Sequence, residues 1–214
     1  LCKKIEDLGF TPKIIRWAEH YKETLGYEND TMKSFREKYL PRTIPIYTEE
    51  ELQAEIWDCN RIVIGGDQVF RNWQMEDSLP ITRYFGDFVF GNKVLASYGA
   101  SFGLDFFNGS DYLINECKKL LKRFDKIGVR EQSGVDILKY TFDVKGSEVI
   151  DPVFLQEKEE YEKIIAAASD IYTPEFKYLA YMVLDGSVGF ADINKNLTTK
   201  LNGINIININ ANKN

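Results

Sequence analysis

The sequence predicts an α/β protein built on a parallel sheet, and three observations favour this fold class. Short apolar runs such as Ile62–Ile64 recur along the chain, and each is typical of a buried strand. Segments with the helical period of apolar residues separate these runs. Small residues follow the runs directly, as Gly65 and Gly66 do. This alternation indicates βα units, in which helices cover both faces of a parallel sheet.

The individual elements are predicted from the spacing of apolar residues, from helix-capping residues, and from the glycines and prolines that end helices. Gly9 ends the first helix and Pro41 the second, and Thr48 with Glu51 has the form of a capping box that begins the third. Pro45 is interpreted as loop. The predicted helices cover residues 1–9, 31–39, 48–59, 111–124, 132–140, 157–169 and 189–201. The predicted strands cover residues 12–17, 62–64, 93–98, 126–129, 148–150, 178–184 and 204–209.

The composition indicates a folded protein and excludes several functional classes. Of the 214 residues 44% are apolar and 14% aromatic, which is enough for a core. The net charge of −6 and the lack of a basic block argue against a nucleic-acid partner. No apolar run approaches the ~20 residues of a transmembrane segment, and no signal peptide is visible, so we expect a cytoplasmic protein. Cys2, Cys59 and Cys117 are widely spaced, which predicts reduced thiols and no metal site.

The composition of the sequence changes after Leu155, where a charged, alanine-containing segment follows, and this change predicts two domains. We expect an N-terminal α/β domain over residues 1–156 and the beginning of a C-terminal α/β domain over residues 174–214. The chain begins inside a helical pattern and ends in a strand-like run. We therefore expect a fragment that lacks its first strand and most of the C-terminal domain.

Four predicted strands end in polar side chains that could form one site. The carboxyl ends of parallel strands share one edge of the sheet, where ligands of open α/β proteins bind. The side chains at these ends are Asp67, Gln68, Ser101, Arg130, Glu131 and Asp151. Together they could hold the hydroxyl groups of a sugar or place a base against one. The alternative is that Arg130, Glu131 and Asp151 only close ion pairs and cap helices.

Four motifs surround these residues, in the segments Gly65–Phe70, Lys93–Gly103, Phe124–Lys139 and Val149–Leu155. They fit the patterns G-[SG]-D-Q-V-[WF], K-x-L-A-S-Y-x-A-S-F-G, F-D-K-I-x-V-R-E-x-S-G-V-x-I-L-K and V-I-D-P-V-F-L. In their order and spacing, these motifs resemble the polysaccharide pyruvyl transferase family. The resemblance covers roughly residues 48–186. Gly66 stands where serine is common in the family, and Phe70 stands where tryptophan is common.

The resemblance implies two Rossmann-like parallel-sheet domains arranged as in GT-B glycosyltransferases, with the second only partly present. It implies transfer of a pyruvyl group from phosphoenolpyruvate to a sugar of a surface polysaccharide, as a ketal and without a cofactor. The acceptor is then a sugar or a lipid-linked oligosaccharide, bound on the N-terminal side, with the donor on the C-terminal side. The sequence is compatible with a homo-oligomer.

Residue roles follow from the same resemblance. Asp67 is the candidate base or a ligand of a sugar hydroxyl, and Gln68 and Gly66 are candidate acceptor contacts. Ser101 would line the same edge, and Arg130 would either contact an anionic group or hold Glu131 in place. The general acid and the ligands of the donor phosphate are expected outside this sequence, because the family's histidine-containing motif is absent. The only histidine, His20, is expected at the surface without a functional role.

Three other functions compete with this interpretation. A GT-B-type glycosyltransferase or a glycan-binding α/β protein would keep the fold without pyruvyl transfer. A response-regulator module would need clustered aspartates and a lysine, and no adjacent acidic residues support it. A dinucleotide site would need a G-x-G-x-x-G turn between a strand and a helix, and the sequence has none.

Overall fold

The predicted α/β class with parallel strands is confirmed. The structure, a computed structural model, describes residues 1–17, 30–72, 79–168, 174–181 and 204–208. The chain divides into two compact units, residues Leu1–Glu160 and Tyr161–Asn214. Their assignment to an acceptor side and a donor side stays a prediction. His20 and the helix predicted over residues 189–201 lie outside the described residues.

A four-stranded parallel sheet is the centre of the first unit. Its strands follow one another in chain order, and each neighbouring pair is parallel. The strands are β3 (Arg61–Ile64), β4 (Val94–Ala100), β5 (Lys126–Val129) and β6 (Ser147–Glu148). Because the pairs are parallel, all four carboxyl ends lie at one edge, as the sequence predicts.

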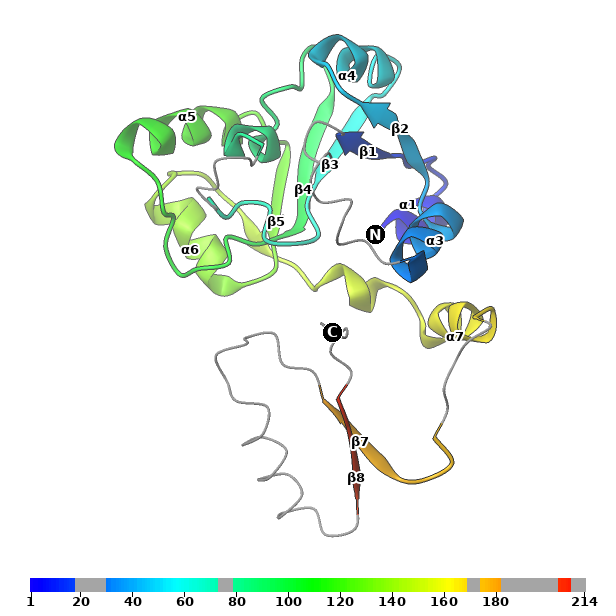
Figure 1. Ribbon diagram of the computed structural model, residues 1–214. Coiled ribbons are helices and arrows are strands. Elements are labelled where there is room, and N and C mark those ends of the chain that lie inside the picture. The colour runs from blue at the N-terminus through cyan, green and yellow to red at the C-terminus, as the bar shows by residue number, and fades with distance from the viewer. Residues whose placement is uncertain (18–29, 73–78, 169–173, 182–203, 209–214) are drawn as a thin grey trace. The chain divides into compact units, whose positions relative to one another are not determined.

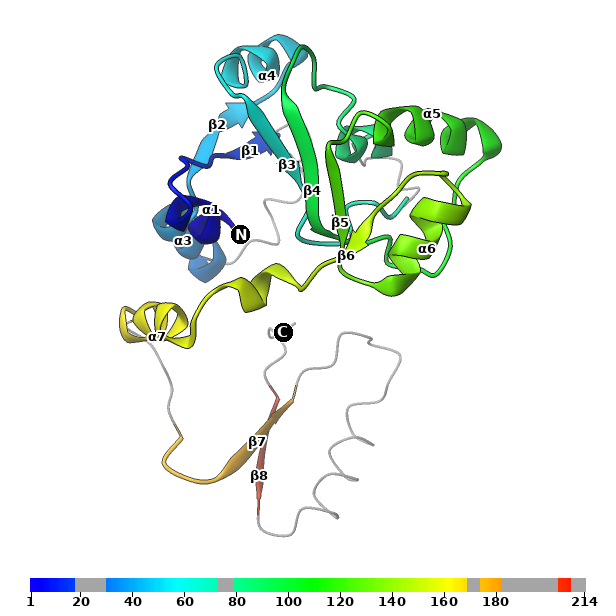
Figure 2. The same cartoon turned by 180° about the vertical axis from the view of Figure 1, so that it is seen from behind.

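Helices surround this sheet and a second, two-stranded sheet of the same unit. The helices among the described residues of this unit are α1 (Cys2–Asp7), α3 (Asp30–Tyr39), α4 (Glu49–Glu55), α5 (Asp111–Leu121) and α6 (Gln132–Tyr140). Two 3-10 turns, η1 (Ile81–Phe85) and η2 (Pro152–Leu155), and the start of α7 (Lys158–Ala166) complete it. In Figures 1 and 2, α5 and α6 lie on one side of β3, β4 and β5, away from the strands β1 (Ile14–Trp17) and β2 (Arg42–Ile46) of the two-stranded sheet.

The core of the unit is rich in phenylalanine. Phe70 is fully buried, and its ring centroid lies 4.8 Å from that of Phe85 and 5.2 Å from that of Phe102. Phe142, which follows the C-cap residue of α6, stacks on Phe102 with a centroid distance of 6.0 Å. Such ring pairs add stability beyond the area that they bury. The segment that follows β3 is therefore anchored in the core by its phenylalanine.

One strand was missed from the sequence, and the interpretation of Pro45 as loop is wrong. Pro45 lies inside β2 (Arg42–Ile46), which pairs in parallel with β1 (Ile14–Trp17), opposite Arg16. A proline has no N–H to donate, but an edge strand leaves half of its backbone groups outside the ladder. The burial of Ile46 explains why the segment is held in place.

The capping box that begins α4 is confirmed, and a lysine closes the other end of the helix. The Thr48 hydroxyl accepts from the Glu51 N–H, and the Glu51 carboxylate accepts from the Thr48 N–H. The ammonium group of Lys93 donates to the carbonyls of Ile56, Trp57 and Cys59 at 2.9, 3.1 and 2.6 Å. Carbonyls at a helix C-terminus lack partners within the helix and favour a cation.

Replacement of Lys93 by methionine is expected to destabilise the first unit by about 1–2 kcal/mol, because three carbonyls lose a charged donor. The measurement is the denaturant midpoint of unfolding. Lys145→Met, which removes the same charge from an exposed position, is the matched control and is expected to change stability by less than about 0.5 kcal/mol. Equal midpoints for the two variants would contradict the capping role.

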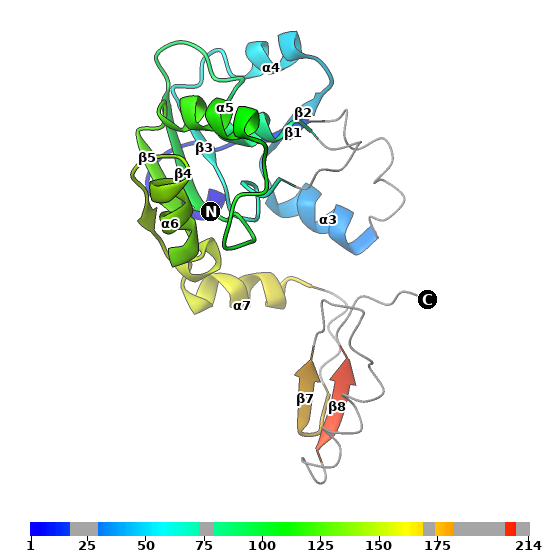
Figure 3. The same ribbon diagram turned by 90° about the vertical axis from the view of Figure 1, so that its left-hand side faces the viewer.

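The second unit contains a parallel strand pair. Strand β7 (Tyr178–Tyr181) pairs with β8 (Asn205–Asn208), and Figure 3 shows the two arrows side by side and pointing the same way. Both lie within strands predicted from the sequence, at residues 178–184 and 204–209. Residues 182–184 of the first predicted strand and residue 209 of the second lie outside the described residues.

Candidate functional site

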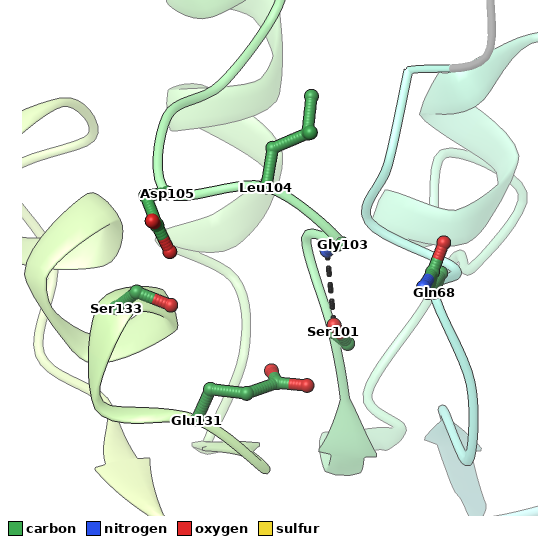
Figure 4. Close-up of a pocket in the computed structure, with 7 residues that line it drawn as sticks. All are labelled: Gln68, Ser101, Gly103, Leu104, Asp105, Glu131 and Ser133. Atoms are coloured by element: carbon green, nitrogen blue, oxygen red, sulfur yellow. Dashed lines mark hydrogen bonds between the residues drawn. The ribbon is translucent and has the colours of Figure 1, made fainter. Parts of the chain in front are cut away.

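A pocket of about 200 Å³ lies at the carboxyl edge of the four-stranded sheet. Its walls come from the segments that follow β3, β4 and β5, including the first turn of α6 (Figure 4). The lining residues are Gln68, Ser101, Gly103, Leu104, Asp105, Glu131 and Ser133. Five of these seven carry a polar side chain, which is the lining that a hydroxylated ligand needs.

Two glycines turn the chain from β3 into the site. Both have positive φ angles, +137° at Gly65 and +100° at Gly66, which favour a residue without a Cβ. A Cβ at Gly65 would lie 2.5 Å from the carbonyl oxygen of Tyr98, whereas one at Gly66 would meet nothing within 4 Å. Gly65 is therefore fixed by the approach of the neighbouring strand, and Gly66 only by its own backbone angle.

The turn is then bonded to the residue that follows β4. The Ser101 N–H donates to the Asp67 carbonyl at 2.9 Å, and the Phe70 N–H donates to the Ser101 carbonyl at 3.1 Å. The hydroxyl of Ser101, which is 1% exposed, accepts from the Gly103 N–H at 2.9 Å. These bonds fix the backbone of the segments that follow β3 and β4, both of which line the pocket. Ser101 thus orders the second loop in addition to lining the pocket.

Arg130 connects three carboxylates that come from three different strand ends. Its Nε donates to Glu131 at 2.8 Å and its Nη1 to Asp151 at 3.3 Å, while Nη2 lies 3.6 Å from Asp67. The Glu131 contact is the main cause that raises the pKa of Arg130, with smaller contributions from Asp151 and Asp67. The arginine side chain is 23% exposed, so these ion pairs are partly shielded from water.

Asp67 combines an ordered backbone with an accessible carboxylate. Its side chain is 80% exposed. Both contacts that described residues make to this carboxylate use Oδ1, which accepts from the Gln68 N–H at 2.8 Å and faces Arg130. Oδ2 is consequently the oxygen that a ligand can reach. A carboxylate placed in this way can accept a proton from a hydroxyl group.

Side-chain oxygens reach the pocket from the side opposite Gln68. In Figure 4, the oxygens of Asp105, Glu131 and Ser133 point into the same space. Ser133 is in the first turn of α6, and Glu131 is the N-cap residue, whose side chain makes no capping bond. Across the pocket, the Gln68 carbonyl oxygen accepts from Arg71 at 3.0 Å. That bond orients the amide and leaves its N–H₂ group as the donor for a ligand.

The structure brings all the predicted site residues to one edge but gives them different positions. Gln68, Ser101 and Glu131 line the pocket, whereas Gly66, Asp67 and Arg130 lie beside it. The alternative interpretation also describes part of the arrangement, because Asp151 caps η2 and binds Arg130. Of the two roles considered for Arg130, holding Glu131 in place agrees with the observed contacts.

Sequence reasoning missed four lining residues: Gly103, Leu104, Asp105 and Ser133. A signal for Ser133 was present, since it belongs to the R-E-x-S-G motif and lies three residues after Arg130. Gly103 ends the second motif, and its φ of +67° marks a turn. No sequence pattern points to Asp105, which belongs to an irregular loop.

Other candidate sites receive little support from the described ranges. Within them, no three His, Cys, Asp or Glu side chains come together to hold a metal ion. The three cysteines are free, and burial raises the pKa of the Cys117 thiol to about 12. None of the described helices has the length and apolar character that crossing a membrane requires.

Comparison with known proteins identifies the family. The chain matches the family model described as polysaccharide pyruvyl transferase over residues 1–208. This match extends beyond the four motifs and covers the first compact unit and most of the second. No curated protein and no solved structure matches the chain. Because the family model accounts for almost the whole sequence, the chain belongs to the polysaccharide pyruvyl transferase family.

Proposed function

We propose that this transferase moves a pyruvyl group from phosphoenolpyruvate to a sugar of a surface polysaccharide, as a ketal, and that the pocket binds the acceptor sugar. Membership of the family makes the chain a transferase that acts on a polysaccharide. The observation that carries the finer proposal is the position of the Asp67 carboxylate, next to a pocket lined by hydroxyl, amide and carboxylate groups. Such groups suit the hydroxyls of a sugar ring.

The proposed reaction has clear requirements for proton transfer. Two sugar hydroxyls form bonds to carbon 2 of phosphoenolpyruvate, whose bond to the phosphate oxygen breaks. One hydroxyl proton ends on the methylene carbon, which becomes a methyl group, and the other leaves with inorganic phosphate. A base that deprotonates the attacking hydroxyl therefore accelerates the first step. We assign this role to Asp67.

The remaining predicted residues support acceptor binding in this proposal. Gln68 would donate from its amide to a sugar oxygen, and Glu131 would accept from a sugar hydroxyl. Arg130 would hold Glu131 and Asp67 in position through its ion pairs. Gly66 would let the acceptor approach the backbone, because no atom lies where its Cβ would be.

The donor needs a different set of groups. Phosphoenolpyruvate carries a carboxylate and a phosphate, which require cationic or N–H donors. None of the described residues that line the pocket is cationic. We therefore propose that the donor phosphate is held by groups outside the pocket, in a two-domain arrangement like that of the GT-B glycosyltransferases.

The test is release of phosphate from phosphoenolpyruvate by the full-length gene product, with a panel of cell-wall and capsular sugars as acceptors. Release that depends on one acceptor, with one ketal formed per phosphate, is the expected result. If a sugar binds but no acceptor gives phosphate release, the proposal is wrong, and glycosyl transfer or glycan binding remains.

A further inference from the structure

The electric charge around the pocket is a property that the proposed reaction does not explain. Asp105 and Glu131 line the pocket, and Asp67 and Asp151 lie beside it through their contacts with Arg130. In the described part of the chain, the cations that contact these groups are Arg130 and Arg71, and Arg71 donates to the Gln68 carbonyl oxygen. Among these described residues, four carboxylates against two guanidinium groups leave the edge negative.

The one arginine that joins the strand ends cannot neutralise a further anion at low cost. Each of its three guanidinium nitrogens already faces a different carboxylate. A ligand carboxylate that approached Glu131 would have to compete with these contacts or lie unpaired among like charges. Between partly buried charges about 4–6 Å apart, each such like-charge contact makes the free energy of binding less favourable by on the order of 1–4 kcal/mol, before screening by salt.

A hydroxyl group meets the opposite situation in the same place. Asp105 is exposed and Glu131 uses Oε1 for Arg130, so both carboxylates retain oxygens that can accept hydrogen bonds. Ser133 adds a hydroxyl, and Gln68 adds its amide N–H₂ on the opposite wall. We call the side formed by Asp105 and Glu131 the acidic wall. A neutral sugar can donate hydrogen bonds to this acidic wall and accept one from the Gln68 amide.

We infer that the pocket selects an uncharged sugar residue and rejects uronic acids and phosphorylated sugars, and that Asp105 and Glu131 determine this selectivity. The inference rests on the proposed function for the role of the pocket as acceptor site. It concerns binding, however, and is tested without any transfer reaction. The charge of the acidic wall, rather than its shape, is the discriminating property.

The experiment compares ligands that differ only in the group at carbon 6 of the sugar, and the ester separates the charge of that group from its shape. NMR titration without phosphoenolpyruvate measures the binding of methyl hexosides, the matching methyl hexuronides, and the methyl esters of those hexuronides. At low ionic strength, the hexoside of the preferred configuration is expected to bind about tenfold or more tightly than its hexuronide. The uncharged ester should recover most of the loss, and added salt should narrow the difference.

Substitutions at the acidic wall locate the effect. Asp105→Asn and Glu131→Gln are expected to reduce the discrimination between hexoside and hexuronide severalfold, the second more strongly because it also releases Arg130. The control is Asp58→Asn, which removes the same charge at the amino end of β3, the opposite edge of the sheet. This control should leave the discrimination unchanged.

The outcomes separate the inference from the proposed function. A hexuronide that binds as tightly as its hexoside, an ester that binds no better than the acid, or the absence of any sugar binding overturns the inference. Discrimination that falls severalfold in Asp105→Asn and in Glu131→Gln but not in Asp58→Asn supports it. If this discrimination is found while phosphate release fails with every acceptor, the inference holds and pyruvyl transfer is excluded.

Discussion

Asp67→Asn is expected to lower kcat by about 10²–10⁴-fold, the usual contribution of a general base. Asparagine keeps the size of the side chain and can still face Arg130, but it cannot accept a proton from a sugar hydroxyl at neutral pH. Because the side chain is 80% exposed, the free energy of unfolding should change by less than about 0.5 kcal/mol. Acceptor-dependent phosphate release measures the first effect and thermal unfolding the second.

Asp151→Asn is the matched control for this variant. Asp151 also contacts Arg130, at 3.3 Å, and an asparagine keeps the side-chain oxygen that caps η2. If Asp67 only held Arg130 in place, the two substitutions would reduce turnover to a similar extent. We expect Asp151→Asn to cost less than about tenfold. Full turnover in Asp67→Asn would remove the base from the proposal.

Gly65→Ala is expected to destabilise the first unit by about 3 kcal/mol or more and to abolish activity at temperatures where the wild type is folded. The φ of +137° is strained for alanine, and the new methyl group would lie 2.5 Å from the Tyr98 carbonyl. That carbonyl belongs to the central strand β4 and cannot move away cheaply. The measurement is the midpoint of thermal or urea unfolding.

The neighbouring glycine separates the two causes of this loss. Gly66→Ala imposes a similar backbone angle, +100°, in a position where an added Cβ meets nothing within 4 Å. It should cost only the backbone strain, about 1–2 kcal/mol, and leave a folded protein. If both variants unfold at the same midpoint, the close contact between the β3 turn and β4 is not the cause.

The sequence contained the fold class and the edge at which the site lies, because both depend on local patterns. Apolar runs ending in glycine predict strands whose carboxyl ends lie together in a parallel sheet, which brings Asp67, Ser101 and Arg130 to one edge. The capping box of α4 was predictable for the same reason, since both of its partners lie within four residues.

What the sequence left out depends on contacts between distant segments. Strand β2 contains Pro45, which locally disfavours a strand, and its pairing with β1 overrides that preference. Asp105 belongs to a loop without a periodic pattern, and its place in the pocket is set by the fold of residues 101–110. The three partners of Arg130 come from segments up to 84 residues apart, from Asp67 to Asp151.

The anchoring of Phe70 has a consequence for how this site can vary. Asp67 and Gln68 lie only a few residues before Phe70, a fully buried side chain that packs against other phenylalanines. The hydrogen bonds between this turn and Ser101 join it to the same cooperative unit. We therefore expect the turn to open only when this part of the core opens with it. Adaptation to a new sugar is then cheaper on the wall that carries Asp105, where an exposed loop can change while the base stays in place.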